Sequence, residues 1–306
     1  REAILELLRD RLKDSGAPVE PGASVVLTGG ASQLVGARET AVRVFDLTIA
    51  MTGASRRSLG DRPFHTVRVH AGHHAGYYPG AETMHLLLHF DGEGRILGAQ
   101  GVGREGVDKR IDVIATAARG GLRVDDLVDL DLSYAPPFGA AKDPVMMLGM
   151  IADNVLSGRL TQHDPVGPLD PETTLVLDVR NPGEWDRGHI EGAMLVPQPD
   201  VAASIEEIRR AAAGRPIVVH CASGFRSYLA NRTLAGAGID SANVSGGFTT
   251  LAIAQPQLVA HPQTSPASAT TSGTTVSSTN AGRNANPSGS TIVTPSLAAA
   301  SSISCS

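Results

Sequence analysis

Residues 216–227 read PIVVHCASGFRS and decide the fold of the C-terminal half of the chain. They begin with a short apolar run at residues 217–219, which is typical of a strand buried on both faces of a parallel sheet. Cys221 follows this run, and apolar residues at helical spacing continue to Ala235. The pattern predicts a strand, a cysteine loop and a helix in succession. The first turn of a helix offers free N–H groups and the positive end of the helix dipole, so we expect Cys221 to be a reactive thiolate.

The loop after Cys221 has the spacing C-x4-R and ends at Arg226. Gly224 allows the loop to curl so that its N–H groups converge on the sulfur, and Arg226 adds a fixed positive charge. Cysteine phosphatases and related arsenate reductases use the longer spacing C-x5-R, whose wider loop surrounds a tetrahedral oxyanion. The shorter loop favours chemistry on a single sulfur atom. His220 precedes the cysteine, but neighbouring strand residues point to opposite faces, so we do not expect it to act as the base.

A second buried strand is predicted at residues 174–180. Trp185, a little further along, is expected in the core. We interpret four titratable side chains in this region as a set of ion pairs that fixes the loops, namely Asp178, Arg180, Glu184 and His189.

Together with Gly188-His189-Ile190 and Ser245-Gly246-Gly247-Phe248, these motifs closely resemble a single rhodanese domain over residues 168–254. The resemblance implies an α/β fold, a parallel sheet flanked by helices. It implies that Cys221 attacks the sulfane sulfur of a donor, becomes a persulfide and passes the sulfur to a thiol acceptor. The persulfide would be held by the loop residues Ala222, Ser223, Gly224, Phe225, Arg226 and Ser227.

The middle of the chain predicts a different fold class, an α+β domain with an antiparallel sheet. A hairpin is expected around residues 91–94. Strands are predicted at residues 41–50, 65–71, 84–90 and 95–100, and helices at residues 107–119 and 144–156.

Two patterns in this region suggest ligands that we do not expect. Gly101-x-Gly103-x-x-Gly106 matches the dinucleotide fingerprint. Its strand belongs to the hairpin, however, and no second parallel βαβ unit follows, so we interpret the motif as a turn that packs a helix on the sheet.

Five histidines lie close together in sequence, but no cysteine or carboxylate completes a ligand set, so no metal site is predicted. The histidines are His70, His73, His74, His85 and His89. On a strand, His85 and His89 would share one face, which could be solvated.

Several motifs in order identify the middle domain. They are HAGYYPGA (residues 74–81), GRILGAQ (94–100), GVDKRID (106–112), YAPPFG (134–139) and KDP (142–144). Over residues 38–158 they resemble the C-terminal dimerisation domain of flavin-dependent pyridine nucleotide–disulfide oxidoreductases, closest to the coenzyme A-disulfide reductase branch and its persulfide- or polysulfide-reducing relatives.

This second resemblance implies a homodimer through residues 38–158. Tyr134 and one of Tyr77 and Tyr78 would lie near a reacting disulfide across the dimer, either as proton donors or as packing residues. Complete relatives would use FAD, NAD(P)H and coenzyme A. Because the FAD domain, the NAD domain and the redox-active cysteine should precede this domain, we expect no cofactor on this chain and no reductase activity from it.

The ends of the chain have a different character. Residues 1–37 include a strand, a double glycine and a helix start that resemble the C-terminal part of an actin-like cell-division ATPase, although the same pattern also suits a purely structural unit. Residues 159–167 are expected to be a linker. Residues 255–306 are a low-complexity segment that we expect to be disordered. Cys305 lies in this tail.

Overall composition excludes some classes of function. With 26 Lys and Arg against 31 Asp and Glu, the net charge is −5, which gives no basic field for nucleic acid or an anionic membrane. No apolar run has the length of a membrane span. Two cysteines in 306 residues argue against a disulfide scaffold, and we expect a cytoplasmic location.

The sequence therefore supports a rhodanese-type sulfurtransferase attached to the dimerisation domain of a truncated reductase. Two alternatives remain open at this point. One is a non-catalytic fragment for oligomerisation and sulfur carriage, and the other is a chimera with no selected function.

Overall fold

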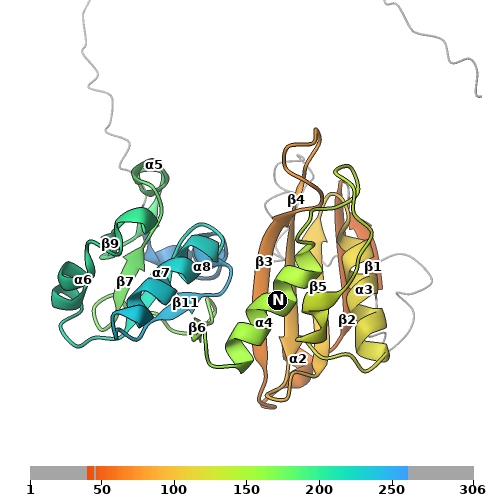
Figure 1. The fold of residues 1–306 in the computed structure, drawn as a ribbon, viewed down its shortest axis with the longest axis horizontal. Coiled ribbons are helices and arrows are strands. Elements are labelled where there is room, and N and C mark those ends of the chain that lie inside the picture. Colours follow the sequence, from red (N-terminus) through yellow and green to blue (C-terminus); the bar gives the residue numbers. More distant parts are fainter. Residues whose placement is uncertain (1–39, 45, 261–306) are drawn as a thin grey trace, which may run out of the picture. The chain divides into compact units, whose positions relative to one another are not determined.

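The structure is a computed structural model that describes residues 40–44 and 46–260. These residues form two five-stranded sheets of different type, one from the first five described strands and one from later strands, together with a two-stranded sheet of β8 (His189–Ile190) and β12 (Val259–Ala260) (Figure 1). Residues 1–37, for which an ATPase likeness was expected, lie outside the described residues. So do residues 261–306, which make up the rest of the expected tail and include Cys305.

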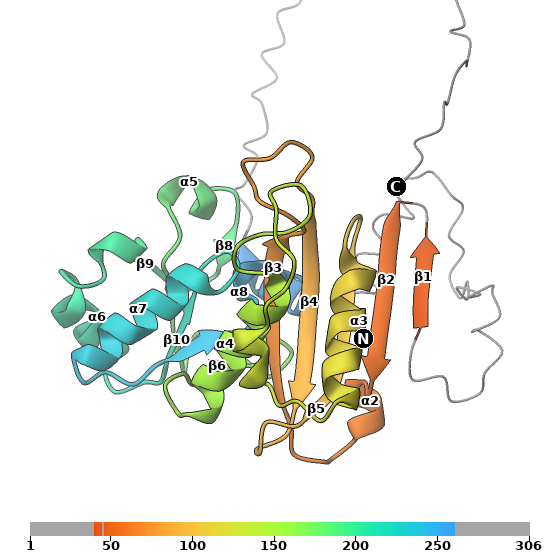
Figure 2. The ribbon, with the colours of Figure 1, turned by 45° about the vertical axis from the view of Figure 1, so that its right-hand side comes forward.

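The first sheet is antiparallel throughout, with the strand order β1-β2-β5-β4-β3. Its strands are β1 (Thr40–Val44), β2 (Leu47–Gly53), β3 (His65–Gly72), β4 (Thr83–Phe90) and β5 (Ile96–Gly103). Helix α3 (Val107–Arg119) packs on β2 and β5, and helix α4 (Pro144–Leu156) packs on β3 and β4. Figure 2 shows both helices lying along the sheet. The predicted antiparallel α+β domain is confirmed.

Alternation along the strands explains which face the helices cover. Met84, Leu86 and Leu88 of β4 are buried, and His85 and Leu87 between them are half-buried. One face of the strand therefore contributes every second side chain to the core. The predicted hairpin around residues 91–94 is confirmed, since β4 and β5 pair antiparallel on either side of it.

The N-terminal strands differ from the prediction. Residues 41–50 were expected to form one strand, but two antiparallel strands, β1 and β2, occupy this region, with Val44 opposite Leu47. The short helix α2 (Arg56–Leu59) then follows β2, and a 3-10 turn at Asp126–Asp129 lies between α3 and α4. Neither short element produces enough periodicity to be read from the sequence.

The glycine motif packs a helix on the sheet, as predicted from the sequence. A Cβ on Gly101 would lie 2.6 Å from Leu86 Cδ2 and 2.7 Å from Val107 Cγ1, so a side chain has no room where α3 meets β5. Gly106 is the N-cap of α3 with a φ of +73°, a conformation that favours glycine. Since β5 runs antiparallel to both neighbours, the motif does not lie in a dinucleotide-binding βαβ unit.

A buried ion pair joins the two helices of this domain. Arg110 of α3 donates to Asp143 Oδ2 from Nε at 3.1 Å and from Nη2 at 2.8 Å. The other oxygen of Asp143 accepts the Val145 N–H at 3.0 Å and so caps α4, which has Pro144 in its first turn. Arg110 Nη2 also donates to the His73 carbonyl at 2.8 Å. One guanidinium thus fixes α3, the start of α4 and the loop after β3.

The second sheet is parallel, with the strand order β6-β11-β10-β7-β9. Its strands are β6 (Gln162–His163), β7 (Leu175–Asp178), β9 (Met194–Leu195), β10 (Ile217–His220) and β11 (Ala242–Val244). The helices are α5 (Pro182–Trp185), α6 (Ile205–Ala212), α7 (Phe225–Gly236) and α8 (Gly247–Ala254). The predicted α/β class is confirmed.

Both faces of this parallel sheet are covered. Leu175 and Leu177 of β7 belong to the core formed with α6 and α7. Val176 between them belongs to the core formed with Leu251 of α8 and Ile190. Every residue of β7 and of β10 is buried, which explains why the sequence shows continuous apolar runs there rather than alternation.

Structured residues extend beyond the boundaries that the sequence suggests for this domain. The expected linker at residues 159–167 contains the edge strand β6. Residues from the start of the expected tail form a 3-10 turn (Pro256–Leu258) and strand β12 (Val259–Ala260), which pairs with β8 (His189–Ile190). Gln255 Nε2 donates to the carbonyls of Pro165 and Gly167 at 2.9 and 2.8 Å. Within residues 40–260, none of the described helices combines the length and apolar character needed to cross a membrane.

Replacing Arg110 tests the buried ion pair. Arg110→Met should lower the free energy of unfolding by about 3–5 kcal/mol, because Asp143 is left buried without its counter-charge. Arg95→Met is the control: the side chain of Arg95 is largely exposed and pairs with Glu93 at the surface, so its loss should cost about 0–1 kcal/mol. Urea unfolding of both variants gives the comparison. Equal costs for the two would contradict the role given to Arg110.

Candidate functional site

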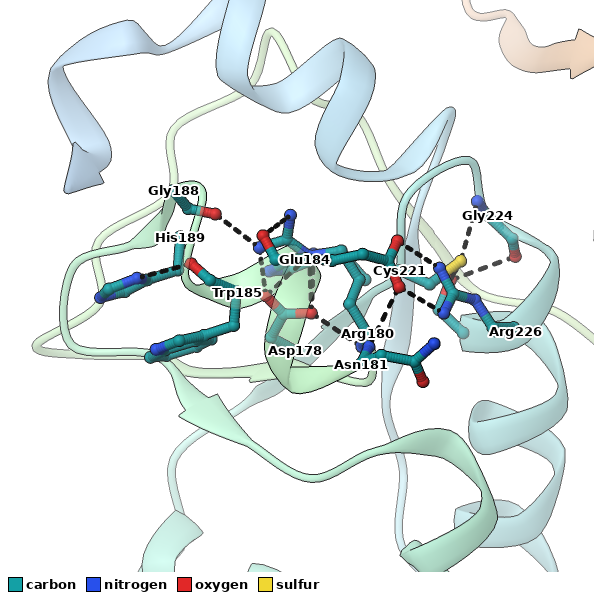
Figure 3. A network of polar contacts seen from close by, with 12 residues as sticks. Asp178, Arg180, Asn181, Glu184, Trp185, Gly188, His189, Cys221, Gly224 and Arg226 are labelled. Atoms are coloured by element: carbon teal, nitrogen blue, oxygen red, sulfur yellow. Dashed lines mark hydrogen bonds and ion pairs between the residues drawn. The ribbon is translucent and has the colours of Figure 1, made fainter. Parts of the chain in front are cut away.

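Cys221 lies at the carboxyl end of β10, a strand in the middle of the parallel sheet. The chain leaves β10, turns through residues 221–224 and enters α7 at Phe225 (Figure 3). Gly224 is the N-cap of α7 with a φ of +110°, which a residue with a side chain rarely adopts. The predicted succession of strand, cysteine loop and helix is confirmed.

The sulfur of Cys221 accepts hydrogen bonds from its own loop. The Gly224 N–H donates to Sγ at 3.2 Å, and Ser227 Oγ lies 3.4 Å from Sγ and 3.1 Å from the Gly224 carbonyl. Cys221 is only 1% exposed. A sulfur at the start of a helix with an N–H directed at it is in an environment that favours a negative charge.

Helix α8 fixes the other side of the loop. The Phe248 N–H donates to the Cys221 carbonyl at 2.7 Å, and the Thr249 N–H donates to the Ala222 carbonyl at 3.0 Å. Gly247 has a φ of +61°, and a Cβ there would lie 2.6 Å from the Cys221 carbonyl oxygen. The loop carbonyls are therefore held by the first turn of α8, and glycine is required for α8 to approach so closely.

The loop arginine is paired with a carboxylate from α5. Arg226 Nη1 lies 2.7 Å from Glu184 Oε2, and Nη2 lies 2.7 Å from Oε1, a bidentate arrangement. Hydrogen bonding to Arg226 lowers the pKa of Glu184 to about 2 although partial burial opposes the shift. The pKa of Arg226 is raised, chiefly by the hydrogen bonds that it donates to Glu184 and further by attraction to the Cys221 sulfur.

A second ion pair lies beneath the site and is buried. Arg180 donates to both oxygens of Asp178, from Nε at 3.0 and 2.9 Å and from Nη2 at 2.6 Å, and Nη2 also donates to the Gly188 carbonyl at 2.9 Å. The Arg180 guanidinium lies 3.8 Å from the centre of the Phe248 ring, a cation–π contact. The pair therefore links β7 to the loop before β8 and to α8.

The four side chains predicted to form one set of ion pairs do not all pair with one another. Asp178 and Arg180 pair as expected, but Glu184 pairs with Arg226 of the cysteine loop, a contact between residues 42 positions apart that the sequence did not indicate. His189 makes no ion pair among the described residues and stacks on Trp185 at 3.8 Å. The expectation that Trp185 lies in the core is wrong, because its ring is half-buried against His189.

His220 is fully buried beside the cysteine but does not contact its sulfur. Its ring stacks on Phe248 at 5.7 Å, and both ring nitrogens lack a hydrogen-bond partner. Burial lowers the pKa of His220 to about 4 and outweighs the attraction of Asp178, whose Oδ1 is 3.8 Å from Nδ1. His220 is therefore neutral at physiological pH and packs as an apolar ring, in agreement with the expectation that it is not the base.

The structure brings together Tyr77 and Tyr134, two of the three tyrosines that the family resemblance singles out. Their hydroxyl oxygens are 3.2 Å apart, and the side chains are 77% and 50% exposed. The hydrogen bond to Tyr134, with smaller effects of desolvation and charge, raises the pKa of Tyr77. Of the two candidates, Tyr77 rather than Tyr78 makes the contact.

Of the five histidines that lie close together in sequence, His74 and His89 are buried and the other three are half-buried. His85 Nδ1 is 2.7 Å from His70 Nδ1, and His89 Nδ1 bonds to Thr66 Oγ1 at 2.9 Å. The alternative of a solvated face is wrong for His89, which is 2% exposed. Burial lowers the pKa of His70 to about 3 and that of His89 to about 4. In the part of the chain that the structure describes, no three His, Cys, Asp or Glu side chains converge as metal ligands would.

Comparison with known families matches each domain separately. Residues 40–144 match the pyridine nucleotide-disulphide oxidoreductase dimerisation domain, and residues 165–253 match the rhodanese-like domain. The chain carries these two domains in tandem. Both matches begin at residue 40 or later, so the likeness of residues 1–37 to an actin-like ATPase finds no support in them.

Curated relatives match about a third of the chain. The coenzyme A disulfide reductases of Staphylococcus haemolyticus and Staphylococcus aureus are 42% and 43% identical over 109 residues. The match covers 35% of this chain and 25% of each relative. The chain thus spans about a quarter of the length of these relatives.

Two solved structures match across both domains. Reduced CoADR-RHD from Bacillus anthracis is 38% identical with a TM-score of 0.69, and the match covers 73% of this chain and 40% of that one. A NAD-dependent persulfide reductase from A. fulgidus is 35% identical with a TM-score of 0.63, covering 70% and 39%. Neither family match reaches half of the chain, so alignments of this extent include parts of both domains.

The burial of His220 predicts loss of stability in acid. Between pH 6.5 and about 4 the unfolded chain binds a proton at His220 that the folded chain does not, so the free energy of unfolding falls as the pH is lowered through this window. The full loss from His220 is about 3 kcal/mol.

Urea unfolding as a function of pH measures this loss. His220→Phe keeps the ring stacked on Phe248 and should reduce the fall between pH 6.5 and 4, leaving the share of His70 and His89, which act in the same direction. His65→Phe, at an exposed position, serves as the control. An unchanged pH dependence in His220→Phe would contradict a neutral, buried His220.

Proposed function

We propose that residues 165–253 form a sulfurtransferase site in which Cys221 carries sulfur as a persulfide. The observation that carries the proposal is the position of Sγ, at the end of a central parallel strand and 3.2 Å from the Gly224 N–H that opens α7. The four residues between Cys221 and Arg226 support the same assignment, because they form a loop suited to one sulfur atom. The rhodanese-like match over this segment agrees with it.

The transfer has two balanced steps. The Cys221 thiolate attacks the outer sulfur of a donor R–S–S⁻, a new S–S bond forms on Cys221, and the old one breaks with its electron pair leaving on the donor as R–S⁻. An acceptor thiolate then attacks the outer sulfur of the Cys221 persulfide, and the Cys221 thiolate is regenerated. No net oxidation occurs, so the transfer itself needs no external electron donor.

In this proposal the loop holds the persulfide. Its outer sulfur is negatively charged, and the N–H groups of the first turn of α7 are donors without partners inside the helix. We assign this role to the loop residues Ala222, Ser223, Gly224, Phe225, Arg226 and Ser227.

The first domain is assigned a dimerisation role. It matches a dimerisation family and exposes several aromatic side chains, of which Phe138 is 70% exposed. We propose a homodimer through residues 38–158. In complete relatives, the tyrosines that correspond to Tyr77 and Tyr134 would lie near a reacting disulfide, where a phenol can donate its proton to a departing thiolate.

We assign the binding of flavin and nicotinamide to complete relatives and not to this chain. The Gly101–Gly106 motif does not fit a dinucleotide, because it lies on an antiparallel strand and opens a helix packed directly on the sheet. Every step proposed for this chain is therefore carried by Cys221 and its loop. By analogy with relatives named for coenzyme A disulfide and persulfide, the donor class is a low-molecular-weight persulfide or polysulfide.

Cys221→Ser tests the assignment. The wild-type chain, mixed with a sulfane-sulfur donor, should gain the mass of one sulfur atom on Cys221 and pass it to cyanide or a thiol. Cys221→Ser should fall to the uncatalysed rate because a neutral hydroxyl cannot replace the thiolate nucleophile. Mass spectrometry and thiocyanate formation are the measurements.

Cys305→Ser is the matched control and should retain full activity. Equal rates for Cys221→Ser and the wild type would refute the proposed sulfurtransferase activity. Uptake of one sulfur without turnover would identify a sulfur carrier instead.

Phe138→Glu tests the dimer. A charge at an exposed aromatic position of the interface should shift the chain from dimer to monomer, with the dissociation constant raised by about tenfold or more. Leu229→Glu, at an exposed position of α7, should leave the dimer intact. Sedimentation equilibrium gives the answer, and a wild-type chain that is monomeric at micromolar concentration would contradict the proposal.

A further inference from the structure

The charge of the candidate site is set by a residue outside the cysteine loop. Arg226 is the loop's cation, because residues 221–227 contain no other Lys or Arg. Its Nη1 and Nη2 atoms both bind the Glu184 carboxylate at 2.7 Å. A guanidinium engaged in this way offers only its Nε side to an incoming anion, and its charge is already offset by the carboxylate.

Glu184 is held in position independently of Arg226. It is the third residue of α5, and its Oε2 accepts the Asn181 N–H at 3.1 Å in a capping box that starts the helix. Its pKa near 2 leaves it ionised throughout the physiological range. The other cation acting on Glu184 is Arg180, which is already paired with Asp178.

The Glu184 carboxylate therefore offsets the charge of Arg226. Because Cys221 reacts as a thiolate, these three side chains carry one negative charge in excess at the moment of attack. Glu184 and Arg226 are 22% and 31% exposed, so water screens their fields only in part. A donor with two negative charges next to its sulfane sulfur is repelled more strongly by this excess than a donor with one.

We propose that Glu184 makes the site selective for organic persulfides and against dianionic inorganic donors such as thiosulfate. The inference rests on the sulfur transfer proposed for Cys221 and assigns the selection among its donors to Glu184. With thiosulfate, Cys221 would take the outer sulfur and release sulfite, a dianion that the occupied Arg226 does not stabilise. With an organic persulfide the leaving group is a thiolate or thiol carrying at most one charge at the sulfur.

Glu184→Gln separates the charge of Glu184 from its structural role. Glutamine has nearly the same shape and still caps a helix from this position, but it no longer neutralises Arg226. The probes are thiosulfate and the persulfide of 2-mercaptoethanol, whose organic part is uncharged. We expect the ratio of kcat/KM for thiosulfate to that for the persulfide to rise by about tenfold, and the rise to shrink at high ionic strength.

Two further variants complete the test. Glu191→Gln removes an exposed carboxylate elsewhere in the same domain and should leave the ratio unchanged. Arg226→Gln removes the cation and should move the ratio in the opposite direction, which keeps the test available if Glu184→Gln does not fold.

The outcomes distinguish this inference from the proposed function. If the wild-type chain takes sulfur from neither donor, the sulfurtransferase proposal fails. If it takes sulfur from both and Glu184→Gln lowers the two rates in equal proportion, Glu184 is purely structural and only the present inference fails.

Discussion

The conformation of the cysteine loop depends on the donors that bind its carbonyl oxygens. A loop that curls around a sulfur must turn its carbonyl oxygens away from it, and buried carbonyls need donors. Here the first turn of α8 supplies them, through the N–H groups of Phe248 and Thr249 to the carbonyls of Cys221 and Ala222. The Gly224 N–H is then free to meet the sulfur. The first turns of two helices therefore share one loop, one binding its carbonyls and the other facing its sulfur.

Arg180 connects this arrangement to the sheet. Its guanidinium binds Asp178 at the end of β7, the Gly188 carbonyl, and the face of the Phe248 ring at the start of α8. A buried ion pair of this kind is not in itself a large source of stability, because desolvation offsets the Coulombic gain. Its contribution is positional: it fixes the distance between β7 and α8, and therefore the position of the backbone that binds the cysteine loop.

The sequence predicted what depends on local pattern. The runs at residues 217–219 and 174–180 are apolar because both faces of those strands are covered, and the helix after Cys221 follows from its own periodicity. The glycine motif was interpreted correctly because the preceding strand belongs to a hairpin. The sequence did not predict contacts that depend on the folded chain. The pairing of Glu184 with Arg226 and that of β12 with β8 join residues far apart in sequence. Trp185 stacks on His189, four residues further on, and this contact also leaves no periodic signal.

Burial of the cysteine has a kinetic consequence. With 1% of Cys221 exposed, a reagent reaches the sulfur only if its own reactive atom is narrow and extends beyond the rest of the molecule. A terminal sulfur on a flexible chain meets this condition more easily than a branched electrophile or a protein disulfide does. Burial therefore slows the reaction of Cys221 with bulky oxidised partners, independently of the intrinsic reactivity of its sulfur.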